Sequence, residues 1–232
     1  MPNSVKKILQ KKRNKEKAIF LLRFFKTQKG QYGEGDVFWG ITVPEQRKIA
    51  QQFKHISLSQ IQELLNDQIH ECRLTGLLIL IEKYNSAEEK EQEKIFKLYL
   101  KNYQNINNWD LVDLSAPAIV GNYLLDKDRK TLYDLAKSNN LWKKRIAIVS
   151  TYAFIKNKDL EDTFKIAKIL LNDSHDLIQK AVGWMLREVG KRNKEKEVEF
   201  LKKYALKMPR MMLRYSIEKF SGPEREKFLS LT

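Results

Sequence analysis

The sequence predicts an all-α protein made of paired helices, and three observations support this. Only 9 of its 232 residues are glycine and 5 are proline, too few for the turns of a many-stranded β-sandwich. Apolar residues recur at steps of three and four along most of the chain, whereas period-two alternation is nowhere sustained over the length of a strand. Hydrophobic residues make up 42% of the chain, which is enough to fill a core.

The first helix is expected over about residues 4–26, where Ile19, Leu22 and Phe25 recur at helical spacing. Pro44 is expected in the first turn of the next helix, because a missing backbone N–H costs nothing there.

Two further helix starts are predicted from capping-box spacing, at Ser57 with Gln60 and at Ser86 with Glu89. More helices are expected near residues 109–124, 129–137, 142–155, 160–171, 176–191, 195–206 and 209–219. The whole chain should then hold roughly ten to twelve helices joined by short polar turns.

The segment from Gly30 to Gly40 is not expected to be helical, because four of its eleven residues are glycine. No strand precedes it and it lacks the spacing of a phosphate-binding P-loop. We expect a structural loop, with backbone contact to a DNA phosphate as the alternative.

From residue 107 onward the predicted helices pair with a loose recurrence of about 35–40 residues, a period found in HEAT-like arrays. We therefore expect residues 1–232 to form a single domain, a HEAT-like helical-repeat solenoid (an α-α superhelix). Such a superhelix curves, and a basic concave face would suit a duplex. A globular helical bundle would give a similar sequence pattern and stays open as the alternative.

The charge points to a polyanionic partner. The chain has 44 Lys and Arg against 29 Asp and Glu, a formal net charge of +15 and a pI near 9.7. This excess favours nucleic acid first and an anionic membrane second. A lysine-rich composition without any such partner is the alternative.

Several classes of protein are disfavoured. Cys72 is the only cysteine, so an internal disulfide and a cysteine zinc site are excluded, and we expect it in the core. His55, His70 and His175 show no metal-ligand spacing, so we expect no metal site. The longest apolar run, residues 77–81, is too short to span a bilayer, and the first residues do not resemble a signal peptide. We expect a cytoplasmic protein that does not enter membranes.

On the helix expected from residue 176, one face is apolar and another carries a basic aromatic stripe. Lys180, Trp184, Arg187 and Lys191 recur on that second face at steps of four, three and four. Such a stripe suits stacking on nucleic-acid bases or sugars. Partial burial of Trp184 beneath lysine stems explains the pattern equally well.

Trp109 and Asp113 lie four residues apart, so on a helix they are neighbours on one face. Asp110 is better explained as an acidic residue that stabilises the positive helix end.

A further basic run, Lys143, Lys144 and Arg145, follows Trp142 at the expected start of another helix. Cations there oppose the helix dipole, so they are not explained as caps. They indicate an anion-facing surface, although a solvated run of charges is the commoner explanation.

Three segments, WDLVD at 109–113, LWKKRIA at 141–147 and AVGWMLRE at 181–188, together resemble the AlkD-like DNA alkylation repair family. The resemblance implies an all-α, HEAT-like solenoid that cups duplex DNA. It also implies a monofunctional DNA glycosylase, which hydrolyses the N-glycosidic bond of cationic N3- and N7-alkylated purines without a cofactor. The residues that match the family's concave face are Trp109, Asp113, Arg145 and Trp184.

The chemistry suits these residue types. A cationic purine leaves easily, and the deoxyribose then becomes oxocarbenium-like. Asp113 would stabilise that charge and orient water, while Trp109 and Trp184 would pack on the sugar. Arg145 would hold a phosphate. We expect Lys143, Lys144, Lys180, Arg187 and Lys191 to bind the DNA backbone.

The expected partner is therefore double-stranded DNA with alkylated bases, bound by a monomer. Two alternatives remain: a non-catalytic DNA-structure-binding repeat protein, and a helical scaffold that binds protein or peptide.

Overall fold

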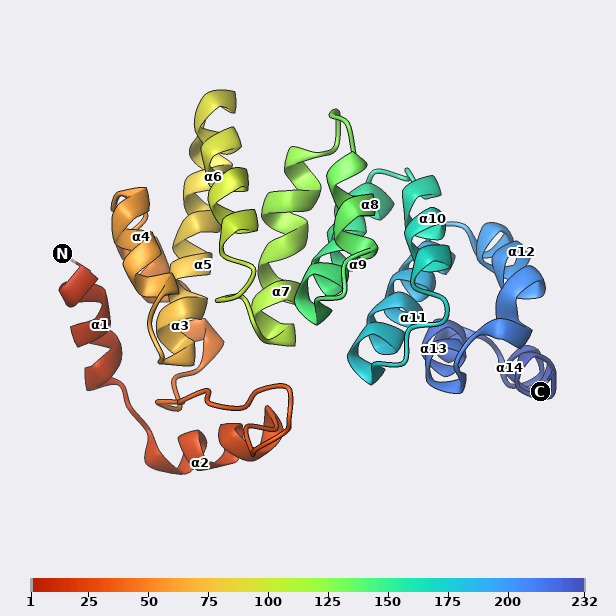
Figure 1. Cartoon of the computed structure of the whole chain (residues 1–232), viewed down its shortest axis with the longest axis horizontal. Coiled ribbons are helices and arrows are strands. Elements are labelled where there is room, and N and C mark those ends of the chain that lie inside the picture. Colours follow the sequence, from red (N-terminus) through yellow and green to blue (C-terminus); the bar gives the residue numbers. More distant parts are fainter. Residues whose placement is uncertain (1, 232) are drawn as a thin grey trace. The chain divides into compact units, whose positions relative to one another are not determined.

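The computed structural model describes residues 2–231, and its regular elements in that range are all helical (Figure 1). The β-type contact found there is an isolated parallel bridge between Val37 and Ile69. The prediction of an all-α protein is confirmed. No helix within the described range combines the length and the apolar character needed to cross a bilayer.

The chain divides into two compact units, residues 1–115 and 116–232. The first contains α1 (Pro2–Lys11), α2 (Lys15–Phe24), α3 (Val43–Gln52), α4 (Leu58–Leu65), α5 (His70–Ser86), α6 (Glu89–Lys101) and nearly all of α7 (Trp109–Ala116). The second contains the π-turn η1 (Pro117–Gly121), α8 (Lys130–Ala136), α9 (Leu141–Lys156), α10 (Glu161–Ile169), α11 (Asp176–Gly190), α12 (Lys194–Tyr204), η2 (Ala205–Lys207), α13 (Arg210–Ser216), η3 (Ile217–Lys219) and α14 (Gly222–Leu229). A single domain over residues 1–232 and a curved solenoid stay predictions.

Helix α5 is the centre of the first unit. It packs against α1, α3, α4 and α6, and its residues from His70 to Leu80 are all buried. A helix surrounded in this way is buried on every side and shows little amphipathic pattern. Cys72 lies within it, buried as expected, and burial raises the pKa of its thiol to about 12.

Helices α9, α11 and α13 form the core of the second unit. Helix α11 packs against both of the others, while α8 and α10 pack against α9. The three core helices begin at Leu141, Asp176 and Arg210, which are 35 and 34 residues apart. The first interval falls at the lower end of the predicted recurrence of about 35–40 residues, and the second lies just below it.

The expected helix over residues 4–26 is instead two helices. Asn14 separates them, because its side chain caps α2 by accepting the N–H of Lys17 and its own N–H donates to the carbonyl of Trp39, both at 2.9 Å. On α2, Ile19 is 55% exposed, so an inward-facing stripe does not form there.

Two of the helix-start predictions are confirmed and one is wrong. Pro44 lies in the first turn of α3, and Ser57 with Gln60 forms a capping box at α4. Ser86 does not begin a helix: it is the last residue of α5, and its hydroxyl donates to the carbonyls of Glu82 and Lys83. The described residues hold fourteen α-helices, more than expected, because several predicted segments are broken.

The segment predicted as a helix over 109–124 changes its winding at Pro117. The ring removes one N–H donor and crowds the preceding turn, and the chain continues as the π-turn η1. This turn ends at Gly121, which lies directly against α9. A Cβ at Gly121 would overlap the carbonyl oxygen of Ser150 and the side chain of Ala153.

Replacing Gly121 with alanine should therefore overpack the second unit and lower its free energy of unfolding by about 1–3 kcal/mol. The matched control is Gly222→Ala, since a Cβ at Gly222 meets nothing within 4 Å. The control should stay within about 0.5 kcal/mol of wild type. Urea unfolding followed by far-ultraviolet circular dichroism measures both variants, and equal stabilities would contradict the packing argument.

Candidate functional site

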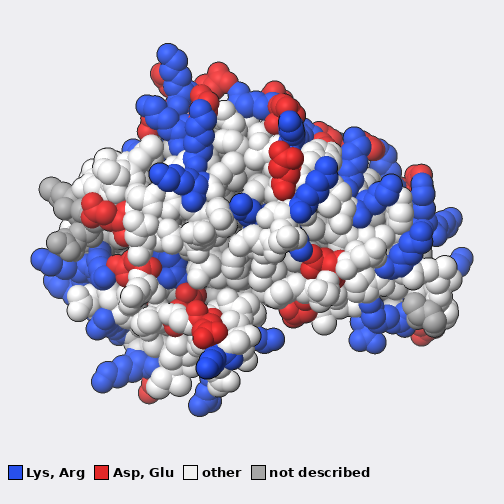
Figure 2. Space-filling view, in the orientation of Figure 1, with Lys and Arg blue, Asp and Glu red and all other residues white. Residues whose placement is uncertain are grey.

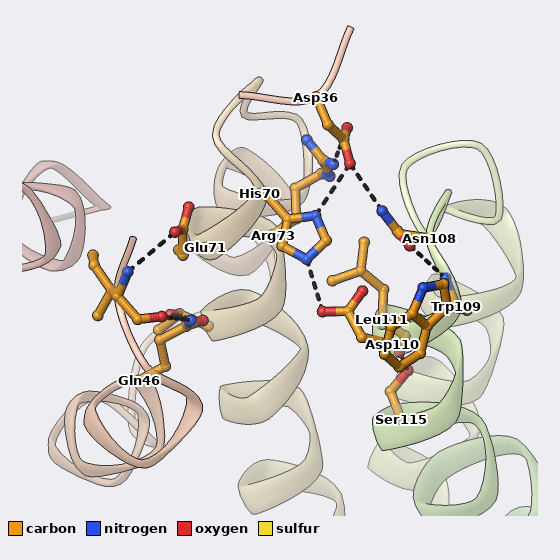
Figure 3. A network of polar contacts seen from close by, with 12 residues as sticks. Asp36, Gln46, His70, Glu71, Arg73, Asn108, Trp109, Asp110, Leu111 and Ser115 are labelled. Atoms are coloured by element: carbon orange, nitrogen blue, oxygen red, sulfur yellow. Dashed lines mark hydrogen bonds and ion pairs between the residues drawn. The ribbon is translucent and has the colours of Figure 1, made fainter. Parts of the chain in front are cut away.

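A buried histidine links three segments of the first unit. His70, at the start of α5, lies 3.1 Å through Nδ1 from Asp36 and 2.8 Å through Nε2 from Asp110 (Figure 3). Both ring nitrogens face carboxylate oxygens, so both must carry protons and the ring is an imidazolium. Burial alone would lower the pKa of His70, but Asp110 and Asp36 outweigh it and raise the pKa to about 9.

Asp36 is the second centre of this network. It accepts hydrogen bonds from His70, from Arg73 at 2.6 Å and from the amide of Asn108 at 3.3 Å. Burial would raise the pKa of Asp36, but His70 and Arg73 hold it below its ordinary value. The glycine-rich loop, α5 and the residue before α7 are thus joined through one carboxylate.

Trp109, at the start of α7, is half-buried beneath the N-terminal segment. Its indole N–H donates to the hydroxyl of Tyr32 at 3.2 Å, and its ring lies 5.8 Å from Phe24 and 5.2 Å from Phe25. Asp113 lies one turn further along the same helix and is also half-buried. The two residues share a face of α7, as the spacing predicts.

The glycine-rich loop has a structural role. The carboxylate of Glu71 accepts the backbone N–H groups of Trp39, Gly40 and Ile41 at 2.7–3.2 Å. Gly40 has φ +79°, and a Cβ there would overlap the carbonyl oxygen of Asn14. These amides already have an acceptor, so the loop behaves as the structural element expected of it.

In the second unit, Arg145 is buried rather than presented on the surface. It is 5% exposed, and its Nη1 donates to the carbonyl of Leu177 at 2.5 Å, which ties α9 to the first turn of α11. Trp184 on α11 is half-buried, with its ring 6.1 Å from Tyr152.

Most of the cations expected to bind DNA have acidic partners within the protein. The ion pairs are Lys144 with Asp173 at 2.7 Å, Lys180 with Asp176 at 2.8 Å, Lys191 with Glu188 at 2.5 Å, and Arg187 with Glu218. Lys143 is half-buried. Figure 2 shows the same interleaving, with acidic side chains beside Lys and Arg in many places. The side chain of Lys191 is 42% exposed and that of Arg187 only 17%, so the stripe on α11 is solvated only in part.

The predicted site residues fall into two groups, one in each unit. Trp109 and Asp113 belong to α7 of the first unit, next to the His70 network. Arg145, Trp184 and four of the five cations lie on α9 and α11 of the second unit, and Lys191 directly follows α11.

The family model described as DNA alkylation repair enzyme matches residues 5–220 of the chain. The chain belongs to this family. Its role therefore lies in the repair of alkylated DNA, and the AlkD-like resemblance of the three segments is confirmed at the level of the family.

A solved structure agrees with the fold of this DNA alkylation repair family member. It is described as a predicted DNA alkylation repair enzyme from Enterococcus faecalis. The likeness has a TM-score of 0.71 at 16% sequence identity and covers 91% of this chain and 98% of that one. No curated protein matches the chain significantly in sequence.

The sequence does not reveal the His70 network. Its members lie 34 and 40 residues apart, and no spacing rule joins a loop aspartate to a histidine at that distance. One weak signal was present: His70 stands at the start of the apolar segment 69–81, where a polar ring needs partners. Asp110, assigned to the helix dipole, proves to have His70 as a specific partner.

The protonated His70 should make stability fall at alkaline pH. Its folded-state pKa of about 9 lies above the ordinary 6.5, so its contribution is complete below pH 6.5 and is lost as pH rises through 9. Asp36, Asp110 and Arg73 are the charged groups that face it. Urea unfolding of wild type and His70→Gln between pH 6 and 10 should show a stability loss that is much smaller in the variant.

Glu197 complicates this measurement, because burial raises its pKa to about 8 and so removes stability as pH rises from 4.5 through 8. Both proteins should therefore carry Glu197→Gln. Equal slopes of stability against pH from 7 to 10 would show that His70 is neutral in the folded protein.

Proposed function

We propose that this family member is a monofunctional DNA glycosylase that removes cationic N3- and N7-alkylated purines from duplex DNA. The match to the repair family over residues 5–220 carries the proposal, together with the carboxylate of Asp113 beside Trp109 on one helical face. We also propose that it acts as a monomer and without a cofactor.

The reaction is a hydrolysis. The C1′–N bond breaks, its electron pair neutralises the cationic purine, and water adds its oxygen to C1′ while losing a proton. Charge therefore moves from the base to the deoxyribose, and a fixed carboxylate near the sugar stabilises it as it develops. Asp113 is our candidate for this group and for orienting the water.

The remaining candidates bind and position the DNA. Trp109 and Trp184 offer ring faces to a cationic sugar. Arg145 is buried and bonded to Leu177, so its proposed role becomes to position the helix that carries Trp184 rather than to hold a phosphate directly. From residue 116 onward there are 25 Lys and Arg and 15 Asp and Glu, a net charge of +10. The pair of Lys180 with Asp176 is partly exposed, and such pairs are weak, so Lys180 can exchange its acid for a phosphate at little cost. Lys143, Lys144, Arg187 and Lys191 are our further candidates for binding the DNA backbone.

One observation favours a second candidate, a DNA-structure binder without catalysis. Trp109 is covered by Phe24, Phe25 and Tyr32, and Arg145 is bonded inside its own unit. A protein that uses only its positive charge would need neither side chain to reach the DNA.

Asp113→Asn separates the two functions. Wild type should release free base from a duplex that carries one 7-methylguanine, and the variant should be slowed at least a hundredfold because it lacks the negative charge. Duplex affinity should be unchanged or slightly higher. Asp126→Asn, at an exposed position in the following turn, is the control and should behave as wild type.

Release at the wild-type rate by Asp113→Asn would overturn the role of the carboxylate. If neither protein releases base but both bind the duplex, the protein is a structure binder.

The logarithm of the affinity for unmodified duplex should fall linearly as the logarithm of the salt concentration rises. Lys191→Gln should reduce that slope by about 1, since each phosphate contact releases counterions. Glu188, its present partner, keeps Arg192 at 2.6 Å, so the substitution leaves no buried acid unpaired. Lys90→Gln, at an exposed position on α6, is the control. Identical slopes in wild type and Lys191→Gln would remove this lysine from the DNA interface.

A further inference from the structure

Helix α2 exposes a cluster of apolar side chains. None of its residues is buried, and four large apolar side chains on it are exposed: Ile19, Phe20, Leu22 and Phe24. Phe20 is 63% exposed and Phe24 is 51% exposed. Single exposed apolar residues are normal on a protein surface, but a contiguous group of them marks a contact site. The helix lies at the edge of the first unit, where a partner can reach it (Figure 1).

The two exposed phenylalanines form a row that ends at the candidate site. They lie four residues apart on one face of the helix, with 5.8 Å between ring centroids and an angle of 18° between the ring planes. Phe24 then meets the ring of Trp109 edge-on, again at 5.8 Å between centroids. A molecule bound at Phe20 is therefore separated from Trp109 by a single phenyl ring.

The charge around α2 selects a polyanion as the partner. Residues 11–29 contain eight Lys and Arg and one acidic residue, a net charge of +7. Lys15 and Arg23 are exposed and form no ion pair within the described residues, unlike Lys180 and Arg187 on α11. They can therefore bind phosphates without first leaving an acid. Two copies of this segment would repel each other, which disfavours self-association through α2.

The order of residues on α2 favours DNA over a membrane surface. Lys15, Ile19 and Arg23 follow one another at steps of four, so they form a row beside the row of Phe20 and Phe24. Cations and apolar side chains are thus mixed on the exposed side of the helix. A helix that lies in a bilayer surface keeps its cations on the face opposite its apolar residues. A nucleic-acid strand carries phosphates beside bases, and so accepts cations and aromatic rings side by side.

Exposed phenyl rings suit bases rather than the phosphate backbone. A phenyl ring gains nothing from a phosphate, but it can stack on the flat face of a base. In an intact duplex those faces are covered by the neighbouring bases, and they become accessible where a base is unpaired and unstacked. The rings would therefore distinguish DNA with an unpaired base from fully paired DNA, whereas the cations would bind both.

We propose that α2 is a DNA-binding element that recognises unpaired bases. Phe20 and Phe24 stack on such a base, while Lys15 and Arg23 hold phosphates beside it. A lesion that weakens base pairing presents a base of this kind, so α2 directs the protein to damaged sites. The proposal rests on the role of the family in the repair of alkylated DNA and not on base excision.

Fluorescence anisotropy with two labelled duplexes tests the proposal. One duplex is fully paired, the other carries one unpaired adenine as a bulge, and neither contains an alkylated base. Wild type should bind the bulged duplex about tenfold more tightly, as expected for one stacked base. Phe20→Ala should lose most of this preference and bind the paired duplex as wild type does. Arg23→Gln should weaken both duplexes by similar factors and reduce the salt slope by about 1.

Matched controls come from exposed positions outside α2. Leu206, in η2, is 70% exposed, and Leu206→Ala should keep the wild-type preference for the bulge. Lys90→Gln, on α6, is the control for Arg23→Gln. Circular dichroism melting shows whether each variant is folded. A 5-iodouracil at the bulge tests contact directly, since light crosslinks this base to an aromatic side chain stacked on it. The crosslink should map to Phe20 or Phe24.

Equal affinities of wild type for the two duplexes would overturn the proposal, as would a preference that Phe20→Ala retains. Sedimentation with phosphatidylserine vesicles tests the membrane alternative. Vesicle binding that Phe20→Ala abolishes, with DNA binding unchanged, would assign α2 to a membrane and overturn its role in DNA recognition.

The result is separate from that of the excision assay. If wild type releases 7-methylguanine but does not prefer the bulged duplex, the role of α2 fails alone. If wild type prefers the bulge through Phe20 but releases no base, α2 recognises unpaired bases and the proposed glycosylase function fails alone.

Discussion

The first unit depends on one buried interaction, the imidazolium of His70 held between two carboxylates. Asp36 comes from the glycine-rich loop and Asp110 from the first turn of α7. The ring of His70 therefore joins segments that lie far apart in the sequence. Desolvating these charges is expensive, and their mutual attraction with the hydrogen bonds of Arg73 and Asn108 offsets that cost. Removing one partner from such a cluster typically costs about 3–5 kcal/mol, because the others stay buried and unpaired. The network therefore orients α7, on which Trp109 and Asp113 lie.

The same network shapes what α7 can do. Asp110 is held by His70, and Asp113 lies one turn later on the same helix, where it is half-buried. Trp109 is fixed by Tyr32 and two phenylalanines, which gives a rigid indole but covers part of it. Sugar contact through Trp109 thus requires its remaining face or a displacement of α2. A carboxylate on the same face of α7 as a partly covered ring is compatible with catalysis that relies on electrostatics more than on enclosure of the base.

Positive charge in the second unit is less available than the composition indicates. The net charge of +10 from residue 116 onward is real, yet Lys144, Lys180, Arg187 and Lys191 are all engaged with acids. Such ion pairs lower the positive electrostatic potential around these cations in the free protein. Their acidic partners also compete with DNA phosphates for the same cations. Affinity would then come from exchange of partners, in which each cation leaves its acid for a phosphate. Glu188 is an example, because it forms ion pairs with both Lys191 and Arg192 and can release one cation while it keeps the other.

The sequence by itself determined the helical class, the family and the pairing of Trp109 with Asp113, because these follow from local periodicity and from motifs a few residues long. It also located the non-helical loop at Gly30–Gly40. It did not show the break between two helices at Asn14, which depends on the side-chain cap of α2. Nor did it show that Ser86 ends α5, where its hydroxyl donates to carbonyls of the preceding turn instead of capping the next helix. Only the tertiary structure decided that Arg145 is buried, because burial depends on which helix covers it. It alone placed the carboxylates around His70, because residues 34 and 40 positions apart meet only when the chain folds.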